Sequence, residues 1–194
     1  MFLIRIAAAP LALLAAGAAQ AACETDAPAE ALGPDAAQAL YDCLSEDMHA
    51  GYVGGDKKWI DPAVVTAYRD WRLASTAPAA PGPHGGRFLL TWVNDVGWEE
   101  YVDWDAEAMP AGTLIAKESF DLGEDGVARP GPLFFMEKAA EGVSPETAGW
   151  LYYAVTPGGA PMAVDVISAC DACHAGFSGT DRLGYPAEAV RVGR

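Results

Sequence analysis

The stretch Gly112-Thr-Leu-Ile-Ala-Lys-Glu-Ser-Phe120 is rich in β-branched and aromatic residues, and aspartate follows it, as is typical of a β-strand. Three further stretches have a similar composition and are bounded by Gly, Pro, Asn or Asp; they cover residues 87–94, 132–138 and 150–156. Short strands separated by turn residues predict an antiparallel sheet. Residues 98–104, between the first two strands, predict a short helix.

The chain ahead of these strands has a helical pattern instead. Apolar residues over 34–48 repeat at helical spacing, and the glycines of 51–55 are predicted to end this helix. Pro62 opens a second predicted helix that runs to about Leu73. The Pro- and Gly-rich residues 75–86 then predict a loop.

The motif Cys170-Asp-Ala-Cys173-His174 has the C-x-x-C-H spacing of c-type haem attachment. This spacing lets both thiols add to the vinyl groups of one porphyrin, and His174 then lies under the iron as the proximal ligand. The alternatives are a redox dithiol, a local disulfide or half of a zinc site. Zinc would need a second pair of ligands at suitable spacing, and the other Cys and His residues are far upstream and unpaired: Cys23, Cys43, His49 and His84. The motif therefore predicts one covalently attached haem c.

The late position of this motif constrains both the fold and the iron ligands. The 20 residues after His174 contain no Met or His, so any sixth ligand must come from upstream: Met48, His49, His84, Met109, Met136 or Met162. Helical bundles also carry late motifs, but the predicted strands argue against a bundle. The predicted fold class is α+β, with N-terminal helices and a loop over residues 22–83. A predominantly antiparallel β-sheet haem domain follows over residues 84–194 and ends in the C-x-x-C-H segment.

Residues 1–21 have the pattern of a secretory signal peptide: Arg5, then an apolar run from Ala7 to Ala19, then Ala-Gln-Ala before the expected cleavage. The apolar run is short for a membrane-spanning helix. Gln20 stands where a lipoprotein signal has a large aliphatic residue. We therefore expect export to the periplasm and no membrane span in the mature chain.

Cys23 and Cys43 remain once the haem is attached. In an oxidising compartment an even pair predicts a disulfide, which would tie the mature N-terminus to the end of the first helix. Two free thiols are the alternative.

The acidic composition bears on partners. The formal net charge is −15 and no basic patch stands out, so nucleic-acid binding is not expected. The acidity is either ordinary surface charge or an attraction for a basic redox partner protein.

Several of these segments together resemble the cytochrome P-460 family, which also includes the cytochromes c′-beta. The matching pieces are Gly112-Thr-Leu-Ile-Ala-Lys117-Glu118, Phe135-Met136-Glu137-Lys138, the aromatic strand from Trp150, the terminal C-x-x-C-H, and the strand that ends at Val93-Asn94. The resemblance covers roughly residues 84–186. It implies a predominantly antiparallel β fold and a periplasmic c-type haem with His174 as the proximal ligand.

The resemblance also implies an activity. In members that oxidise hydroxylamine, a lysine is covalently cross-linked to the porphyrin, and Lys117 is the matching position. Other members have no cross-link and bind nitric oxide or other small ligands at an open distal face. The first predicted function is therefore an oxidoreductase that acts on hydroxylamine or nitric oxide at five-coordinate haem. The alternatives are a non-enzymatic gas-binding or electron-transfer cytochrome, and a haem-free binding module with a Cys170–Cys173 disulfide. Family members are often dimers, which allows a homodimer here.

Lys117 is the residue that the resemblance assigns to the haem edge. Strand alternation places Thr113, Ile115 and Lys117 on one face and Glu118 on the other. Beside a porphyrin, Lys117 can form the cross-link or donate a hydrogen bond to a propionate or a bound ligand. The alternatives are a solvated lysine on an open sheet face and a salt bridge to neighbours of Glu118.

Other residues complete the predicted site. Hydroxylamine oxidation needs a proton acceptor, and the carboxylates considered are Glu118, Glu137 and Asp165, each with ordinary surface charge as the alternative. Arg87 opens the first strand, where it either pairs with a haem propionate or lies as a charge at the sheet edge. His84, in a flexible Pro-His-Gly-Gly sequence, would make a six-coordinate electron carrier if it reached the iron.

Overall fold

The computed structural model describes residues 23–193 of the chain. The signal peptide predicted for residues 1–21 lies outside this range. Within it, none of the helices combines the length and the apolar character needed to cross a membrane.

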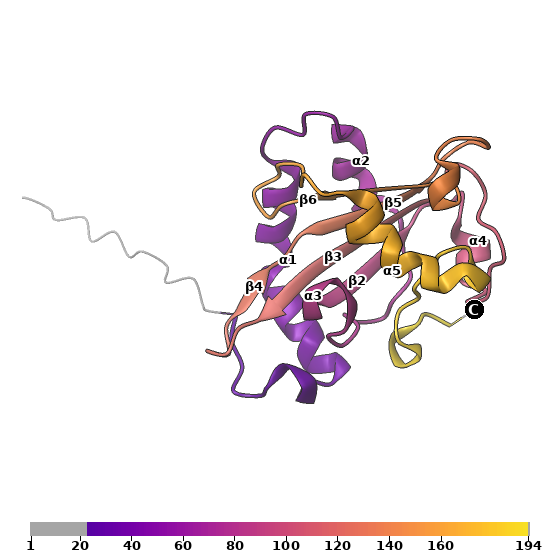
Figure 1. Cartoon of the computed structure of the whole chain (residues 1–194). Coiled ribbons are helices and arrows are strands. Elements are labelled where there is room, and N and C mark those ends of the chain that lie inside the picture. The colour runs from indigo at the N-terminus through magenta and orange to yellow at the C-terminus, as the bar shows by residue number, and fades with distance from the viewer. Residues whose placement is uncertain (1–22, 194) are drawn as a thin grey trace, which may run out of the picture.

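An antiparallel sheet forms the centre of the molecule, and six strands of the described range belong to it (Figure 1). They are β1 (Arg72–Leu73), β2 (Phe88–Val93), β3 (Leu114–Leu122), β4 (Ala128–Pro130), β5 (Leu133–Lys138) and β6 (Trp150–Val155). Along the sheet the order is β1-β2-β3-β5-β6, and β4 pairs with one end of β3. The four strands predicted from the sequence are confirmed as β2, β3, β5 and β6, whereas β1 and β4 were not predicted.

The helices are α1 (Pro34–Val53), α2 (Pro62–Ala67), α3 (Pro83–Gly86), α4 (Trp98–Tyr101) and α5 (Ala172–His174). Short 3-10 turns lie at Ala29–Ala31, Tyr68–Asp70, Pro145–Thr147, Ala175–Thr180 and Glu188–Val190, and a π-helical turn lies at Ile167–Asp171. The helix predicted over residues 34–48 is present as α1, but its predicted end was wrong. α1 continues through Gly51, where a Cβ would collide with the carbonyl of Pro157. Gly51 therefore permits close packing against the loop after β6 instead of ending the helix.

The second predicted helix is shorter than expected, because α2 ends at Ala67. The side chains of Tyr68 and Arg69 both bind Glu118 of β3. Arg72 then pairs with β2 in the sheet. These contacts turn the chain toward the sheet, and a helix that continued to Leu73 could not make them.

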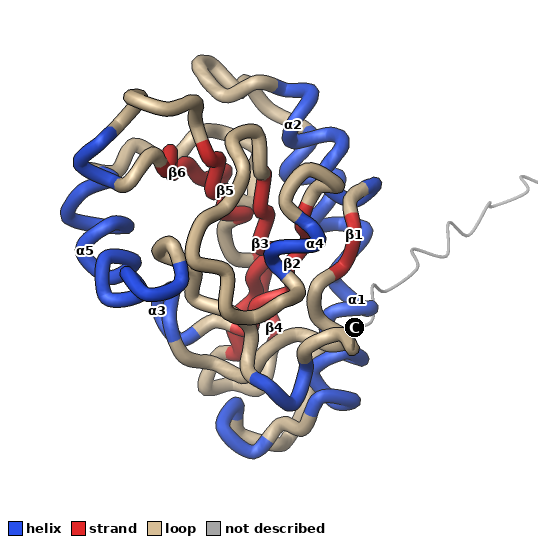
Figure 2. The backbone as a smooth tube through the Cα atoms, turned by 90° about the vertical axis from the view of Figure 1, so that its right-hand side faces the viewer, coloured by secondary structure: helices blue, strands red, loops and turns tan. Residues whose placement is uncertain are grey.

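Strand alternation gives the sheet two differently covered faces. The α1 face includes Leu90 and Phe135, which share one apolar core with α1 and α2. The C-terminal face includes Ile115 and Met136, which pack in a second core with Leu183 from the end of the chain. Figure 2 shows α1 and α2 on one side of the sheet and α3 and α5 on the other. The N-terminal helices and the sheet therefore form one packed unit.

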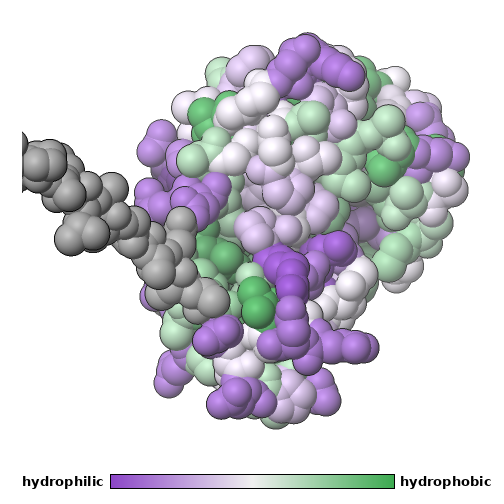
Figure 3. Space-filling view, turned by 90° about the vertical axis from the view of Figure 1, so that its left-hand side faces the viewer, coloured by the Kyte–Doolittle hydropathy of each residue, from purple (hydrophilic) through white to green (hydrophobic). Residues whose placement is uncertain are grey.

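Hydrophilic residues cover much of one side of this unit. Figure 3 views the side that lies to the left in Figure 1; hydrophilic residues occupy its top, its flanks and its lower rim, with weakly hydrophobic residues between them. The chain as a whole has a formal net charge of −15.

A disulfide joins Cys23 to Cys43, as the sequence predicts, with the two Cα atoms 5.8 Å apart. The carbonyl of Cys23 also accepts a hydrogen bond from the amide of Ala128 in β4, at 2.7 Å. The start of the described chain is therefore attached both to α1 and to the sheet.

We expect the paired substitutions Cys23→Ser and Cys43→Ser to lower the free energy of unfolding by about 3 kcal/mol, because the bond closes a loop of 20 residues. Urea unfolding of the mature protein, followed by far-UV circular dichroism, measures this loss. A thiol reductant should destabilise the wild type to a similar extent and leave the double variant unchanged. Equal stability of the two proteins without reductant would contradict the prediction.

Candidate functional site

The C-x-x-C-H motif lies on a continuous helical segment that covers the C-terminal face of the sheet (Figure 1). Cys170 is half-buried and Cys173 is exposed, and both are free thiols. His174 is buried, with 8% of its surface exposed. Residues three and four apart lie on the same side of a helical turn, so Cys170 faces the same way as Cys173 and His174. The local disulfide that the sequence left open is not formed.

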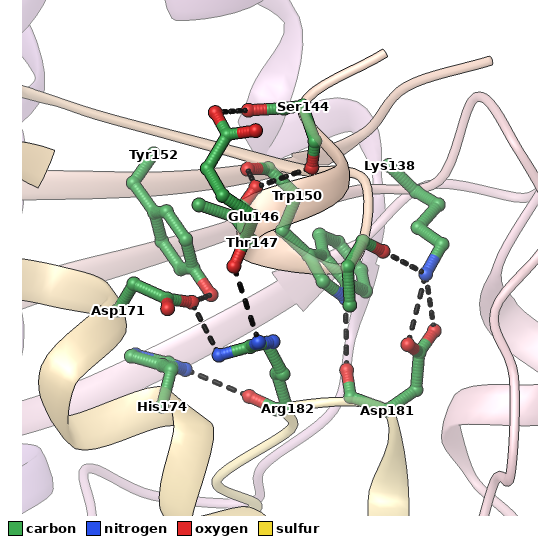
Figure 4. Close-up of polar contacts among 11 residues, drawn as sticks. Lys138, Ser144, Glu146, Thr147, Trp150, Tyr152, Asp171, His174, Asp181 and Arg182 are labelled. Atoms are coloured by element: carbon green, nitrogen blue, oxygen red, sulfur yellow. Dashed lines mark hydrogen bonds and ion pairs between the residues drawn. The ribbon is translucent and has the colours of Figure 1, made fainter. Parts of the chain in front are cut away.

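The His174 ring is held by a backbone carbonyl. Its Nδ1 lies 2.7 Å from the carbonyl oxygen of Arg182 (Figure 4). A carbonyl only accepts hydrogen bonds, so Nδ1 carries the proton and donates it. Burial lowers the pKa of His174, which favours the neutral imidazole with a free Nε2. A ring nitrogen that donates to a carbonyl while the other is free is the arrangement typical of metal-binding histidines.

The backbone at Arg182 is positioned by its own side chain. Arg182 has a φ of 65°, and its guanidinium pairs with Asp171 at 2.7 Å. The hydroxyl of Tyr152, on β6, donates to the same carboxylate at 3.2 Å. Asp171, the residue between Cys170 and Ala172, is therefore a buried link between the motif, the sheet and the carbonyl that holds His174.

The preceding residue, Asp181, anchors this turn to the sheet a second time. Its carboxylate pairs with Lys138 of β5 at 2.7 Å, and its carbonyl accepts a hydrogen bond from the indole of Trp150 at 2.8 Å (Figure 4). The roles of Asp171, Asp181 and Arg182 were not predicted from the sequence. The only sequence signal is the presence of charged residues, one inside the motif and two shortly after it.

Lys117 lies in the middle of β3, opposite Thr91 of β2 and Phe134 of β5, and it shares the C-terminal face with them. Only 9% of its surface is exposed, so the alternative of a solvated lysine is wrong. Its Nζ donates to the carbonyl of Gly184 at 2.9 Å. Burial lowers the pKa of Lys117 to about 8. A substantial fraction of this side chain is therefore an uncharged amine at mildly alkaline pH.

His84 lies beside the motif although it is distant in sequence, and both ribbon views place α3 next to α5 (Figures 1 and 2). Its ring stacks on Phe134, with the ring centres 4.6 Å apart. The centre of the His174 ring lies 6.2 Å from that of His84. Burial, together with the nearby charges of Lys117, His174 and Arg87, lowers the pKa of His84 to about 3. Three basic side chains therefore gather on the C-terminal face.

Arg87 supports the turn that carries His84. It donates to the carbonyl of His84 at 2.6 Å, and its Nε lies 3.8 Å from the carboxylate of Asp121. In this structure Arg87 has protein partners, whereas the sequence suggested a haem propionate or an open sheet edge.

Of the three carboxylates considered as proton acceptors, two lie on the other face of the sheet and one lies near the motif. Glu118 and Glu137 alternate with Lys117 and Phe134 along their strands and belong to the α1 face. Glu137 accepts a hydrogen bond from Tyr153 at 3.3 Å. Asp165 is exposed and accepts a hydrogen bond from the amide of Ile167. Glu118 and Glu137 therefore do not share the C-terminal face with Lys117. Asp165 directly precedes the helical segment that carries the motif, and burial together with the charges of Asp171 and Asp165 raises the pKa of Cys170.

Glu118 is part of a buried ionic network. Its side chain is fully buried, and its Oε1 lies 2.7 Å from Nε of Arg69. The hydroxyl of Tyr68 donates to the same oxygen. Arg69 also donates to the carbonyl of Ser45 in α1, at 2.7 Å. This network joins α1, the turn after α2 and β3, so Glu118 has a structural role.

A surface cavity of about 480 Å³ lies at the β6 edge of the sheet and is lined by residues that include Trp59, Glu137, Tyr153 and Val166. It is not lined by Cys170, Cys173, His174 or Lys117, but Trp150 and Tyr152, which bind Asp181 and Asp171, are among its lining residues. Within residues 23–193, no three His, Cys, Asp or Glu side chains gather as ligands of a metal ion.

Comparisons of the chain with models of known protein families and with curated protein sequences find no match. What the site can do is therefore argued from its own residues.

The substitution Arg69→Met should lower the free energy of unfolding by about 3–5 kcal/mol, because it leaves the Glu118 carboxylate buried without an ionic partner. Urea unfolding measures this effect. Adding Glu118→Gln removes the uncompensated charge and should restore part of the stability. A change in the absorption spectrum of the mature protein caused by Glu118→Gln alone would contradict the structural role, because it would place Glu118 in the site of the C-x-x-C-H motif.

Lys117 should make stability depend on pH in a chain that cannot attach haem, with Cys170 and Cys173 both replaced by Ala. The pKa of Lys117 is about 8 in the folded state, because the side chain is buried, and has its ordinary value of 10.5 in the unfolded chain. At pH values between these two pKa values, Lys117 binds more protons in the unfolded chain than in the folded protein. The free energy of unfolding therefore increases with pH in this range. We expect an increase of about 2 kcal/mol between pH 8 and pH 10.

Lys117→Met in the same background is the control for this prediction. Buried tyrosines with raised pKa values oppose the effect near pH 10 in both proteins, so the difference between the two urea-unfolding series isolates Lys117. Parallel pH dependence in the two proteins would refute the assignment.

Proposed function

We propose that this chain is an exported, periplasmic c-type haem protein of the cytochrome P-460 type. Haem would be attached through Cys170 and Cys173, with Nε2 of His174 as the proximal nitrogen. The observation that carries the proposal is the hydrogen bond from Nδ1 of His174 to the Arg182 carbonyl, next to two free thiols on the same side of the helix. A histidine prepared in this way for a metal, within C-x-x-C-H, fits haem better than a redox dithiol, which needs no such histidine.

The activity proposed first is that of an oxidoreductase acting on hydroxylamine or nitric oxide. When bound, haem supplies an iron that binds a small nitrogen compound and accepts its electrons. Asp171 and Arg182 hold His174 in place. Lys117 lies on the same sheet face and has a pKa of about 8 because it is buried. Its uncharged fraction suits a bond to the porphyrin, and its charged fraction suits a hydrogen bond to a propionate or a bound ligand.

The second candidate function is electron transfer or gas binding without catalysis. One specific observation favours it: His84 lies on the same side of the sheet, with its ring centre 6.2 Å from that of His174. A cytochrome of this kind would exchange electrons with a redox partner protein, and the acidic surface would favour a basic one.

Holoprotein matured in a periplasm distinguishes the candidates by its ferrous absorption spectrum and intact mass. A broad, strongly red-shifted Soret band, with a mass below apoprotein plus haem by the hydrogens lost in cross-linking, would support a bond from Lys117 and hydroxylamine oxidation. Lys117→Ala should then abolish both signals, while Lys58→Ala, at an exposed lysine, should keep them. An ordinary c-type spectrum and the simple haem mass would favour the second candidate.

The same preparation tests the haem itself. Cys170→Ala combined with Cys173→Ala should remove covalent haem, as denaturing gel electrophoresis with a haem stain detects. A colourless wild-type product, made together with haem-maturation proteins, would contradict the proposed function as a whole.

A further inference from the structure

The two histidines of the site are spaced as a pair of ligands on one metal. A bond from histidine to a metal ion is about 2 Å long, and the bonding nitrogen lies about 1.1 Å from the centre of a ring with bonds of about 1.33 Å. Two imidazoles on opposite sides of one ion therefore have ring centres about 6 Å apart. The centres of His84 and His174 are 6.2 Å apart.

The other rings around His174 do not offer a free ligand atom. The structure places Tyr152 and Phe177 next to it, with ring centres at 5.2 and 6.3 Å. Phe177 has no donor atom. The Tyr152 hydroxyl is bound to Asp171, and burial raises its pKa. His84 is the ring among these three with a nitrogen available to a metal.

The local structure holds His84 in this position. His84 has a φ of 58° and is followed by Gly85 and Gly86, which also have positive φ. Such a conformation is uncommon for a residue with a side chain and persists where the surroundings impose it. Here the surroundings are the stacked ring of Phe134 and the Arg87 guanidinium bound to the His84 carbonyl.

One nitrogen of His84 has no partner in the described part of the chain. Nδ1 is buried and makes no hydrogen bond. A buried polar atom without a partner is unfavourable, and a bond to a metal would remove this cost. The stacked ring and the imposed backbone hold His84 near His174, and the unpartnered nitrogen is an atom that could bind a metal there.

We propose that a ring nitrogen of His84 is the second axial ligand of the haem iron in the resting protein. This inference rests on the proposed haem attachment and goes beyond it, because a small nitrogen ligand must then displace His84. The five-coordinate iron expected from the sequence is then the state formed when His84 leaves. The short Pro83–Gly86 turn, rich in glycine, is the element that moves.

Electron paramagnetic resonance and absorption spectra of ferric holoprotein test the proposal. The wild type should be low-spin, and His84→Ala should be predominantly high-spin. Added imidazole should restore the low-spin signal in His84→Ala. His49→Ala is the matched control, since His49 packs against Tyr68 on the other side of the sheet, and its spectrum should equal that of the wild type.

Carbon monoxide binding to ferrous holoprotein gives a second readout. The observed rate should saturate at high carbon monoxide in the wild type, because release of His84 becomes limiting. In His84→Ala the observed rate should stay proportional to the carbon monoxide concentration. The apparent affinity for carbon monoxide should increase at least about tenfold, because the iron without a bound His84 is no longer a minor state.

The outcomes separate this inference from the proposed function. Covalent haem with a high-spin wild type, or with a low-spin His84→Ala in the absence of imidazole, would overturn the assignment of His84 and leave the haem protein standing. A wild type without covalent haem would overturn both.

Discussion

Because side chains alternate along β3, the neighbouring buried residues Lys117 and Glu118 lie on opposite faces of the sheet. The segments that cover each face supply the partners of the residue on that face. Glu118 points toward the α1 face, where Arg69 and Tyr68 bind it and tie α1 to the sheet. Lys117 points toward the C-terminal face, where a backbone carbonyl is its hydrogen-bond partner. A shift of one residue in the register of β3 would exchange the faces of Lys117 and Glu118. The register therefore determines which face holds the ionic network of Glu118 and which face holds Lys117.

The two faces differ in how their charges are compensated. On the α1 face the carboxylate has an ionic partner and a hydroxyl donor, as expected of a buried charge that supports the fold. On the C-terminal face Lys117, His84 and His174 lie near one another, and their pKa values are all lowered, chiefly by burial. Positive φ values at His84 and Arg182 add backbone strain there. Strain and uncompensated basic groups in one place are typical of a functional site.

The sequence predicts the parts of this structure that depend on local pattern. The strand at residues 112–120, the helix after Pro34 and the pairing of Cys23 with Cys43 follow from composition and spacing and are confirmed. The reason for glycine at position 51 of α1 was not predicted, because the carbonyl that a Cβ there would meet belongs to Pro157, more than a hundred residues away. The support of His174 by Arg182 was missed for a similar reason: it requires a left-handed backbone turn that the sheet stabilises through Lys138 and Trp150.

The proposed bond from His84 to the iron would link the two candidate functions. With the nitrogen of His84 on the iron, the proposed site suits electron transfer, because little has to rearrange when an electron is gained or lost. With His84 released, the same site has an open position next to Lys117, where a small nitrogen compound can bind. The balance depends on the turn from Pro83 to Gly86, which Arg87 and Phe134 hold against the sheet. In the proposed haem protein, substitutions in that turn would therefore act through the availability of the iron, while substitutions of Asp171 and Arg182 would act through the opposite histidine.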